Sequence, residues 1–226
     1  MRPPEPKHFA TFPTLISTWD LKGHPCHEVA IDMIENYKDV GEHRLVKGGQ
    51  SSYITGNEQF LSDKRLVDLW KTIQSCCDTY TEEAGIDYTL ISTSWFNTMS
   101  EGNSVEAHRH ERSVISGAYY PYADEGSSPL MLESPIQQLR MNDCIIKDTY
   151  YSKYNLDVGA RTGLLVLFPS WIKHYVNPTP VQRLYREPKK RYVISFNTIR
   201  NADRGYMRTV KDYRICLLYT SDAADE

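Results

Sequence analysis

The spacing of apolar side chains changes near residue 85. Before that point they recur at helical intervals, over about 24–38 and again over 62–85, where Ser62 is a candidate N-cap and Gly85 a candidate C-cap. The polar stretch 40–58 between them is expected to be a loop. This part of the pattern predicts two amphipathic helices.

After residue 85 the apolar residues alternate with polar ones, which is typical of half-buried strands. One more strand is predicted near the start of the chain, within 8–19. Helices followed by many short strands favour an antiparallel sandwich or barrel with the helices packed outside. We therefore expect a single folding unit in which residues 1–85 support a β core at 86–200. The strands of that core are predicted at 88–97, 114–120, 129–135, 164–168 and 191–199.

The composition is that of an ordinary globular chain. It has 226 residues, of which 40% are hydrophobic, and a formal net charge of −3. This charge gives no indication of a nucleic-acid partner, and the longest apolar run, 164–168, is too short to span a membrane. Five cysteines without a CxxC pair are expected to be small buried hydrophobic residues in a reducing compartment. No secretory signal is visible, so we expect a cytoplasmic protein, in the host cytoplasm if it is viral.

The last residues differ in character from the rest. Residues 216–226 follow an arginine-rich segment abruptly and show neither helical nor strand periodicity. They resemble the translation of a transposase sequencing adapter, and a short native acidic tail is the alternative. On the first interpretation the native sequence is truncated near residue 215, and 201–215 is the beginning of an incomplete C-terminal segment.

Three histidines flank two of the predicted strands. His108 and His110 occupy alternate positions of an extended segment before the strand 114–120, so both imidazoles are expected on one side. His174 follows the strand 164–168. An Fe(II) site needs a few fixed nitrogen or oxygen ligands and open positions for oxygen and a cosubstrate. Taken singly, each histidine is equally typical of a polar turn or a structural role, so the prediction depends on their combination.

A polar and cationic strand face is predicted at 191–199. Alternation places Arg191 and Ser195 on one face and the large apolar residues on the other. A buried guanidinium binds a carboxylate with two parallel hydrogen bonds, and a neighbouring hydroxyl adds another. Asn97 is a further candidate for a cosubstrate carboxylate, whereas Trp95 is expected to point the opposite way, into the core.

Together these residues resemble the 2-oxoglutarate/Fe(II)-dependent oxygenases that are common in marine phages and bacteria, within a prolyl-hydroxylase-like superfamily. The resemblance covers about 85–200. It implies a mainly β fold with flanking helices, a double-stranded β-helix (jelly roll, cupin-like), with His108 and His174 as iron ligands and Arg191 on the distal carboxylate of 2-oxoglutarate. Its motifs are Ser94-Trp95-Phe96-Asn97, Gly102, His108-Arg109-His110, Ser116-Gly117-Ala118-Tyr119-Tyr120, Phe168-Pro169-Ser170-Trp171-Ile172-Lys173-His174 and Arg191-Tyr192-Val193-Ile194-Ser195-Phe196-Asn197.

One departure from the family pattern concerns the metal. His110 stands where superfamily members usually carry Asp or Glu, so the expected site has three histidines and less negative charge. Glu111 is an alternative third ligand if a turn or bulge brings it round. Asp124 and Glu125, in a later loop, are more remote alternatives.

A second departure concerns the cosubstrate. Val193 replaces a serine that would add a hydroxyl beside the arginine. Ser195, on the same face but two residues further along, is expected to substitute for it. The predicted cosubstrate contacts are therefore Arg191, Ser195 and Asn97.

The sequence thus predicts a non-heme Fe(II)- and 2-oxoglutarate-dependent dioxygenase. It would consume O2 and hydroxylate an unidentified small-molecule or peptide substrate, with succinate and CO2 as coproducts and ascorbate as a candidate additional cofactor. Two alternatives stay open: a cupin-like three-histidine dioxygenase that uses no 2-oxo acid, and a non-catalytic ligand-binding jelly roll. The positions of the three imidazoles and the direction of Arg191 distinguish among them.

Overall fold

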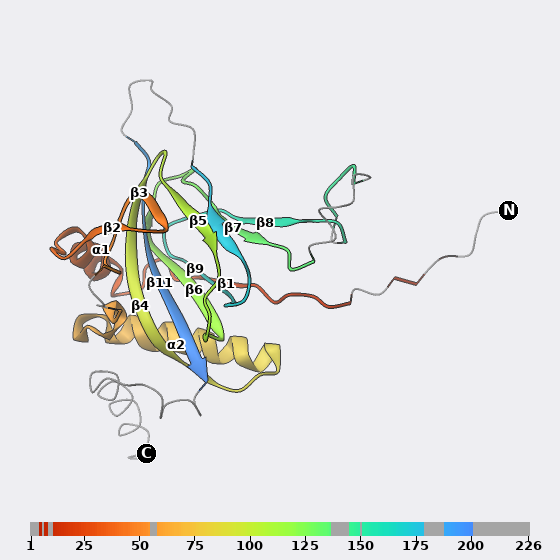
Figure 1. Ribbon diagram of the computed structural model, residues 1–226. Coiled ribbons are helices and arrows are strands. Elements are labelled where there is room, and N and C mark those ends of the chain that lie inside the picture. The colour runs from red at the N-terminus through yellow and green to blue at the C-terminus, as the bar shows by residue number, and fades with distance from the viewer. Residues whose placement is uncertain are drawn as a thin grey trace, which may run out of the picture.

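A single curled antiparallel sheet makes up most of the computed structural model (Figure 1). The structure describes residues 5, 7–8, 11–54, 58–136, 145–149, 151–178 and 188–200. The proposed truncated segment 201–215 and the adapter-like residues 216–226 lie outside this part of the chain. The strands are β1 (Ser17–Asp20), β2 (Gly41–His43), β3 (Val46–Ser51), β4 (Thr89–Ser100), β5 (Ser104–His108), β6 (Ile115–Ala123), β7 (Leu130–Glu133), β8 (Asn155–Val158), β9 (Leu164–Pro169), β10 (His174–Val176) and β11 (Lys190–Arg200).

The strand order folds the sheet into two layers. Strands β1, β9, β6, β11 and β4 are neighbours in the larger layer, and β5, β10, β7 and β8 form the smaller one (Figure 1). Strand β3 joins the layers because it pairs with both β4 and β5. This is the arrangement of a double-stranded β-helix, so the predicted mainly β fold with flanking helices is confirmed.

Two helices cover the outer face of the larger layer. They are α1 (His27–Glu35) and α2 (Val67–Ala84), and short 3₁₀ turns at Phe60–Ser62 and Lys64–Leu66 precede the second (Figure 1). Gly85 ends α2 in the left-handed conformation (φ 66°), as the sequence predicts. The predicted N-cap at Ser62 is wrong, because the Ser62 hydroxyl donates to Gln59 and the helix begins five residues later.

The sheet separates two hydrophobic cores. The outer core packs both helices against alternate residues of the larger layer, including Phe96, Tyr119, Ile194 and Phe196. The inner core lies between the layers and contains Val193 with residues of β6, β7 and β9. The predicted alternation of 191–197 is therefore present, with apolar residues toward the helices and the polar face inward. Cys26, Cys76 and Cys77 are buried free thiols, as expected, while the other two cysteines are outside the described residues.

The prediction of a loop at 40–58 is wrong for residues 41–43 and 46–51, which form β2 and β3. Few apolar residues are needed there because β3 is held by backbone pairing on both sides. A Cβ at Gly49 would lie 2.7 Å from the Thr98 carbonyl oxygen, so the glycine permits the close approach to β4. Strands β5, β8 and β10 were also not predicted, since each is too short to show a clear period.

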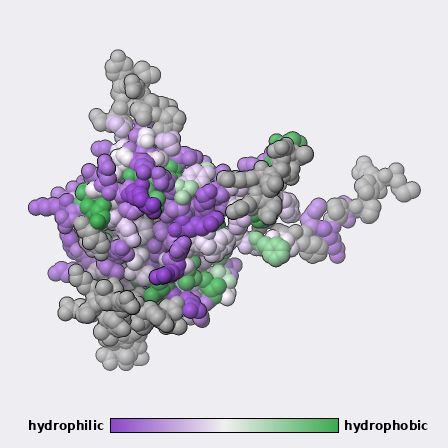
Figure 2. Space-filling model, viewed as in Figure 1, coloured by the Kyte–Doolittle hydropathy of each residue, from purple (hydrophilic) through white to green (hydrophobic). Residues whose placement is uncertain are grey.

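The visible surface is mostly hydrophilic, with hydrophobic residues in small separate groups (Figure 2). Among the described residues, no helix is both long enough and apolar enough to cross a membrane.

Close packing of β6 against β11 makes a first prediction. A Cβ at Gly117 would lie 2.1 Å from Cζ of Phe196, a ring that is 1% exposed. We expect Gly117→Ala to lower the free energy of unfolding by about 1–3 kcal/mol, the usual effect of overpacking a core. Urea unfolding would measure this. The control is Gly159→Ala, where a Cβ would meet no atom within 4 Å; equal midpoints for both variants would contradict the prediction.

Candidate metal centre

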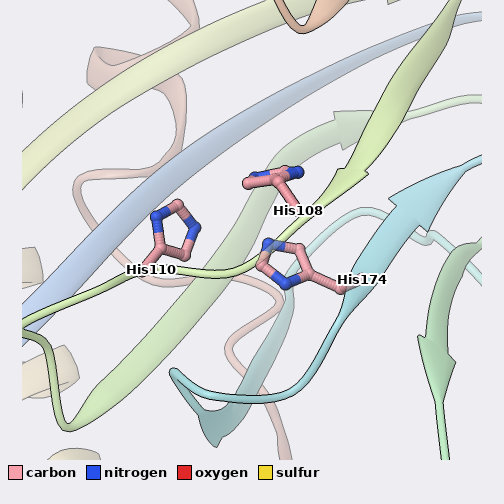
Figure 3. A group of neighbouring side chains, drawn as sticks. All are labelled: His108, His110 and His174. Carbon is pink, nitrogen blue, oxygen red and sulfur yellow. The ribbon is translucent and has the colours of Figure 1, made fainter.

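Three histidines meet at the junction of β5 and β10. His108, the last residue of β5, pairs directly with His174, the first residue of β10. His110 lies two residues beyond His108 and turns its ring to the same side, as the alternation predicts (Figure 3). One ring nitrogen from each imidazole lies within 4.8 Å of those of the other two. The ring centroids are 4.2 Å apart for His108 and His174, and 5.0 Å apart for each pair that includes His110.

Backbone carbonyls fix the orientation of two of these rings. Nδ1 of His108 lies 2.7 Å from the Glu106 oxygen, and Nδ1 of His174 lies 3.0 Å from the Ile172 oxygen. Because a carbonyl oxygen only accepts, both Nδ1 atoms carry the proton, and each Nε2 keeps a free lone pair. This is the tautomer in which imidazoles coordinate a metal through Nε2.

The protein environment keeps the cluster neutral. Burial, followed by the nearby imidazoles, lowers the pKa of His174 to about 3 and that of His110 to about 4. Burial also lowers the pKa of His108, against the opposing effect of its hydrogen bond to Glu106. Three neutral nitrogen donors on one side of a common point can bind a divalent metal ion.

The acidic alternatives lie apart from this cluster. Among the described residues, the three histidines form a group of potential ligands that none of Glu111, Asp124 and Glu125 joins. Glu111 lies in the exposed turn after His110. The carboxylate of Asp124 accepts hydrogen bonds from the Tyr122 hydroxyl at 2.6 Å and the Lys190 backbone N–H at 2.7 Å, so it fixes the ends of β6 and β11 instead.

The histidines line a cavity of about 610 Å³ between the two layers, and Arg191 lines the same cavity. Arg191 is only 3% exposed. Its guanidinium donates to the Ser128 carbonyl oxygen and lies 3.0 Å from the Met99 sulfur. No carboxylate among the described residues forms an ion pair with it, and burial lowers its pKa. The cavity therefore contains a buried positive charge that has no carboxylate counter-ion within the described part of the chain.

The same wall holds Asn97 and Ser195, as predicted. Asn97 pairs with Val193 across β4 and β11, and its buried Oδ1 has no hydrogen-bond partner in the described part of the chain. The expectation for Trp95 is wrong: it lines the cavity with Asn97, because residues two apart on a strand share a face. Its ring lies 5.8 Å from that of His110.

Two further features were not assigned a role from the sequence. Tyr120 is fully buried and lines the cavity, where it interacts electrostatically with Arg191. Oγ of Ser116 lies 2.9 Å from Oγ of Ser170 and 2.7 Å from Oδ1 of Asn197. On a strand, the adjacent Tyr119 and Tyr120 point to opposite faces, so the sequence pattern allows only one of them to reach the cavity. The hydrogen bonds of Ser116 join separate elements and are visible only in the tertiary structure.

A family model matches the part of the chain that contains the three histidines and Arg191. Residues 93–197 match the model of the family described as "Putative 2OG-Fe(II) oxygenase". No curated protein gave a match to the chain.

Several solved structures share the fold. A Trichoplax adhaerens prolyl hydroxylase, in complex with a peptide of hypoxia inducible factor, is 14% identical with a TM-score of 0.55, and the match covers 86% of this chain and 87% of that one. A Pseudomonas putida prolyl-4-hydroxylase is 13% identical with a TM-score of 0.55, covering 83% and 94%. HygX from Streptomyces hygroscopicus, with nickel and 2-oxoglutarate bound, is 8% identical with a TM-score of 0.55, covering 83% and 84%.

The low pKa values of the cluster predict acid sensitivity of the metal-free protein. An imidazole that is neutral when folded takes up a proton on unfolding once the pH is below its ordinary pKa of about 6.5. The free energy of unfolding should therefore fall as the pH drops from 6.5 toward 4. In His174→Gln this dependence should be weaker by about 1.4 kcal/mol per pH unit. Urea unfolding in the presence of a chelator would measure it, and equal pH slopes in both proteins would contradict it.

Proposed function

We propose that this protein catalyses the iron-dependent oxidation of an organic substrate, with 2-oxoglutarate as cosubstrate. Residues 93–197, which match the 2OG-Fe(II) oxygenase family model, contain the residues of the proposed site. One observation carries this proposal: three neutral imidazoles and a buried arginine face one cavity, and no described carboxylate pairs with the arginine. The histidines would hold the metal, and the arginine would hold the far end of the cosubstrate.

The donor set of the site fits a divalent iron ion. His108, His110 and His174 supply three nitrogen atoms from one side, which leaves the cavity side open for a cosubstrate and oxygen. Hydrogen bonds from His108 and His174 to carbonyls hold their Nε2 atoms in place before any ion arrives. When bound, Fe(II) with 2-oxoglutarate and O2 supplies the oxidising chemistry that yields succinate, CO2 and a hydroxylated product.

Arg191 provides the reason for a dicarboxylate cosubstrate. A charge buried without a partner is costly, and a carboxylate with two parallel hydrogen bonds is the usual partner of a guanidinium. The Tyr120 hydroxyl and the Asn97 amide line the same cavity, and the hydroxyl and the amide NH2 group would each donate a hydrogen bond to this carboxylate. Together these groups would bind one carboxylate and orient the other end toward the histidines.

Ser195 has a different place in this proposal from the one expected. It lies four residues along β11 from Arg191, which is about 13 Å in an extended strand, so it cannot share the carboxylate held there. Trp95 lies opposite Ser195 across the β4–β11 pair. We therefore assign both to the part of the cavity that receives the oxidised substrate, a small molecule or a peptide.

The protein as a whole would act as one cytoplasmic unit. Residues 1–85 would support the β core at 86–200, because the helices pack on its outer face and β3 joins its two layers. The helices pack on the face of the sheet away from the cavity, so we propose a supporting role for them rather than a catalytic one.

The cupin-like alternative is kept for one reason: none of the described carboxylates joins the histidine cluster. It uses no 2-oxo acid and so gives Arg191 no anion to bind. Binding of 2-oxoglutarate separates the two functions.

Succinate formation tests the proposed reaction. The protein would be loaded anaerobically with Fe(II), then given 2-oxoglutarate and O2, with and without ascorbate. We expect succinate that depends on iron. In Arg191→Met the affinity for 2-oxoglutarate should fall about 100-fold, since two charge-assisted hydrogen bonds are lost. Arg65→Met is the control, because Arg65 pairs with Asp63 on the exposed surface. Absence of iron-dependent succinate, or unchanged cosubstrate affinity in Arg191→Met, would refute the proposal.

Metal titration tests the ligands separately. We expect His108→Ala and His174→Ala each to lower the affinity for Fe(II) or Co(II) at least tenfold, because each removes one of three nitrogen donors. His24→Ala is the matched control, because the His24 ring contacts Thr72 of α2 and is not part of the cluster. Isothermal titration calorimetry under anaerobic conditions would measure the affinities. Equal affinities in the control and either cluster variant would exclude that histidine as a ligand.

A further inference from the structure

The turn between β9 and β10 holds two of the three histidines through its backbone. The Ile172 carbonyl oxygen accepts from Nδ1 of His174. The Ser170 carbonyl oxygen accepts from the backbone N–H of His110 at 3.1 Å. The position of this turn therefore determines how two of the imidazoles approach the third.

His110 depends on this turn more than the other two histidines do. It lies beyond the end of β5, and no described residue accepts or donates a hydrogen bond at its ring nitrogens. Its ring lies against the rings of Trp95, His108 and His174. Its backbone bond to Ser170 is thus the directional contact that places it.

Ser170 is itself fixed by a chain of buried side chains. Its Oγ lies 2.9 Å from Oγ of Ser116, and that atom lies 2.7 Å from Oδ1 of Asn197. The Ser116 hydroxyl is the donor toward both atoms, and because it has one proton it donates to one of them at a time. All three residues are at most 8% exposed, and the Ser170 N–H donates to the Val114 carbonyl at 3.0 Å.

These side-chain hydrogen bonds connect Ser170 to the sheet in addition to its backbone hydrogen bond to Val114. Ser116 and Asn197 are already partners in the β6–β11 ladder, so their strands do not need a side-chain bond to stay together. Ser170 is the member that lies in a turn. The extra connection therefore ties the turn of β9 and β10 to the centre of the larger layer.

We propose that Ser116, Ser170 and Asn197 are positioning residues for the third metal ligand, His110. This proposal rests on the proposed function of the three-histidine metal centre. The three side chains do not touch the metal or the cosubstrate; they hold the Ser170 carbonyl where it directs the backbone of His110. Loss of these side-chain hydrogen bonds would displace His110 more than His174, because His174 is also held by its strand pairs with His108 and Leu132.

Cobalt titration of Ser170→Ala and Ser116→Ala tests the proposal. With Co(II) as the probe under anaerobic conditions, we expect about tenfold weaker binding in each variant, the lower end of the effect of removing an outer hydrogen-bond partner. The visible absorption of bound Co(II) should also change, because one nitrogen donor is displaced. Ser94→Ala is the matched control: its buried hydroxyl accepts from the Leu61 N–H at 2.8 Å, away from the histidines. It should bind Co(II) as the wild type does.

The same substitution made in the His110→Ala variant distinguishes a loss of His110 positioning from a general loss of structure. In His110→Ala the ligand is already absent, so adding Ser170→Ala should leave the Co(II) affinity unchanged. An equal loss in both backgrounds would overturn the proposal, and so would wild-type affinity and absorption in both serine variants. If the wild type itself binds no Co(II), the metal centre of the proposed function fails, and this result is distinct from a failure of the positioning residues alone.

Discussion

The pairing of β5 with β10 is the contact on which the rest of the site depends. It places His108 opposite His174, so that two imidazoles from segments far apart in the sequence lie 4.2 Å apart between ring centroids. The pairing exists because β3 turns the sheet from β4 onto β5 and so closes one layer over the other. Both the histidines and Arg191 then face one enclosed volume, although Arg191 belongs to the opposite layer. Without this closure the chain would have the same residues but no common cavity.

The charge of the site follows from the residue at position 110. A carboxylate there would leave a divalent ion with one net positive charge, whereas three neutral imidazoles leave two. Arg191 adds another positive charge, and no described carboxylate lies within the histidine cluster or pairs with the guanidinium. A dianion such as 2-oxoglutarate compensates two of these charges at once, with one carboxylate at each end of the cavity. A histidine at 110 thus strengthens the electrostatic demand for a dianionic cosubstrate.

Features that depend only on the spacing of a few consecutive residues were predictable from the sequence. The alternation of β11, the side shared by His108 and His110, and the C-cap at Gly85 each follow from a few consecutive residues. Strand β3 was missed because its stability comes from backbone partners on both sides and not from its own side chains. Trp95 was misplaced through an error in applying the strand period, which puts it on the face of Asn97. The link from Ser170 to Asn197 joins residues on separate elements, and no local pattern could show it.

The outer core and the metal centre are connected through the same two strands. On β6, Gly117 faces the helices and receives the ring of Phe196, while the adjacent Ser116 faces inward and bonds to Asn197. On β11, Phe196 and Asn197 are likewise neighbours on opposite faces. A change in the distance between these strands on the helix side would therefore also act on the hydrogen bond on the cavity side, because adjacent residues share one backbone. Packing under the helices and the proposed positioning of the third imidazole thus depend on the same pair of strands.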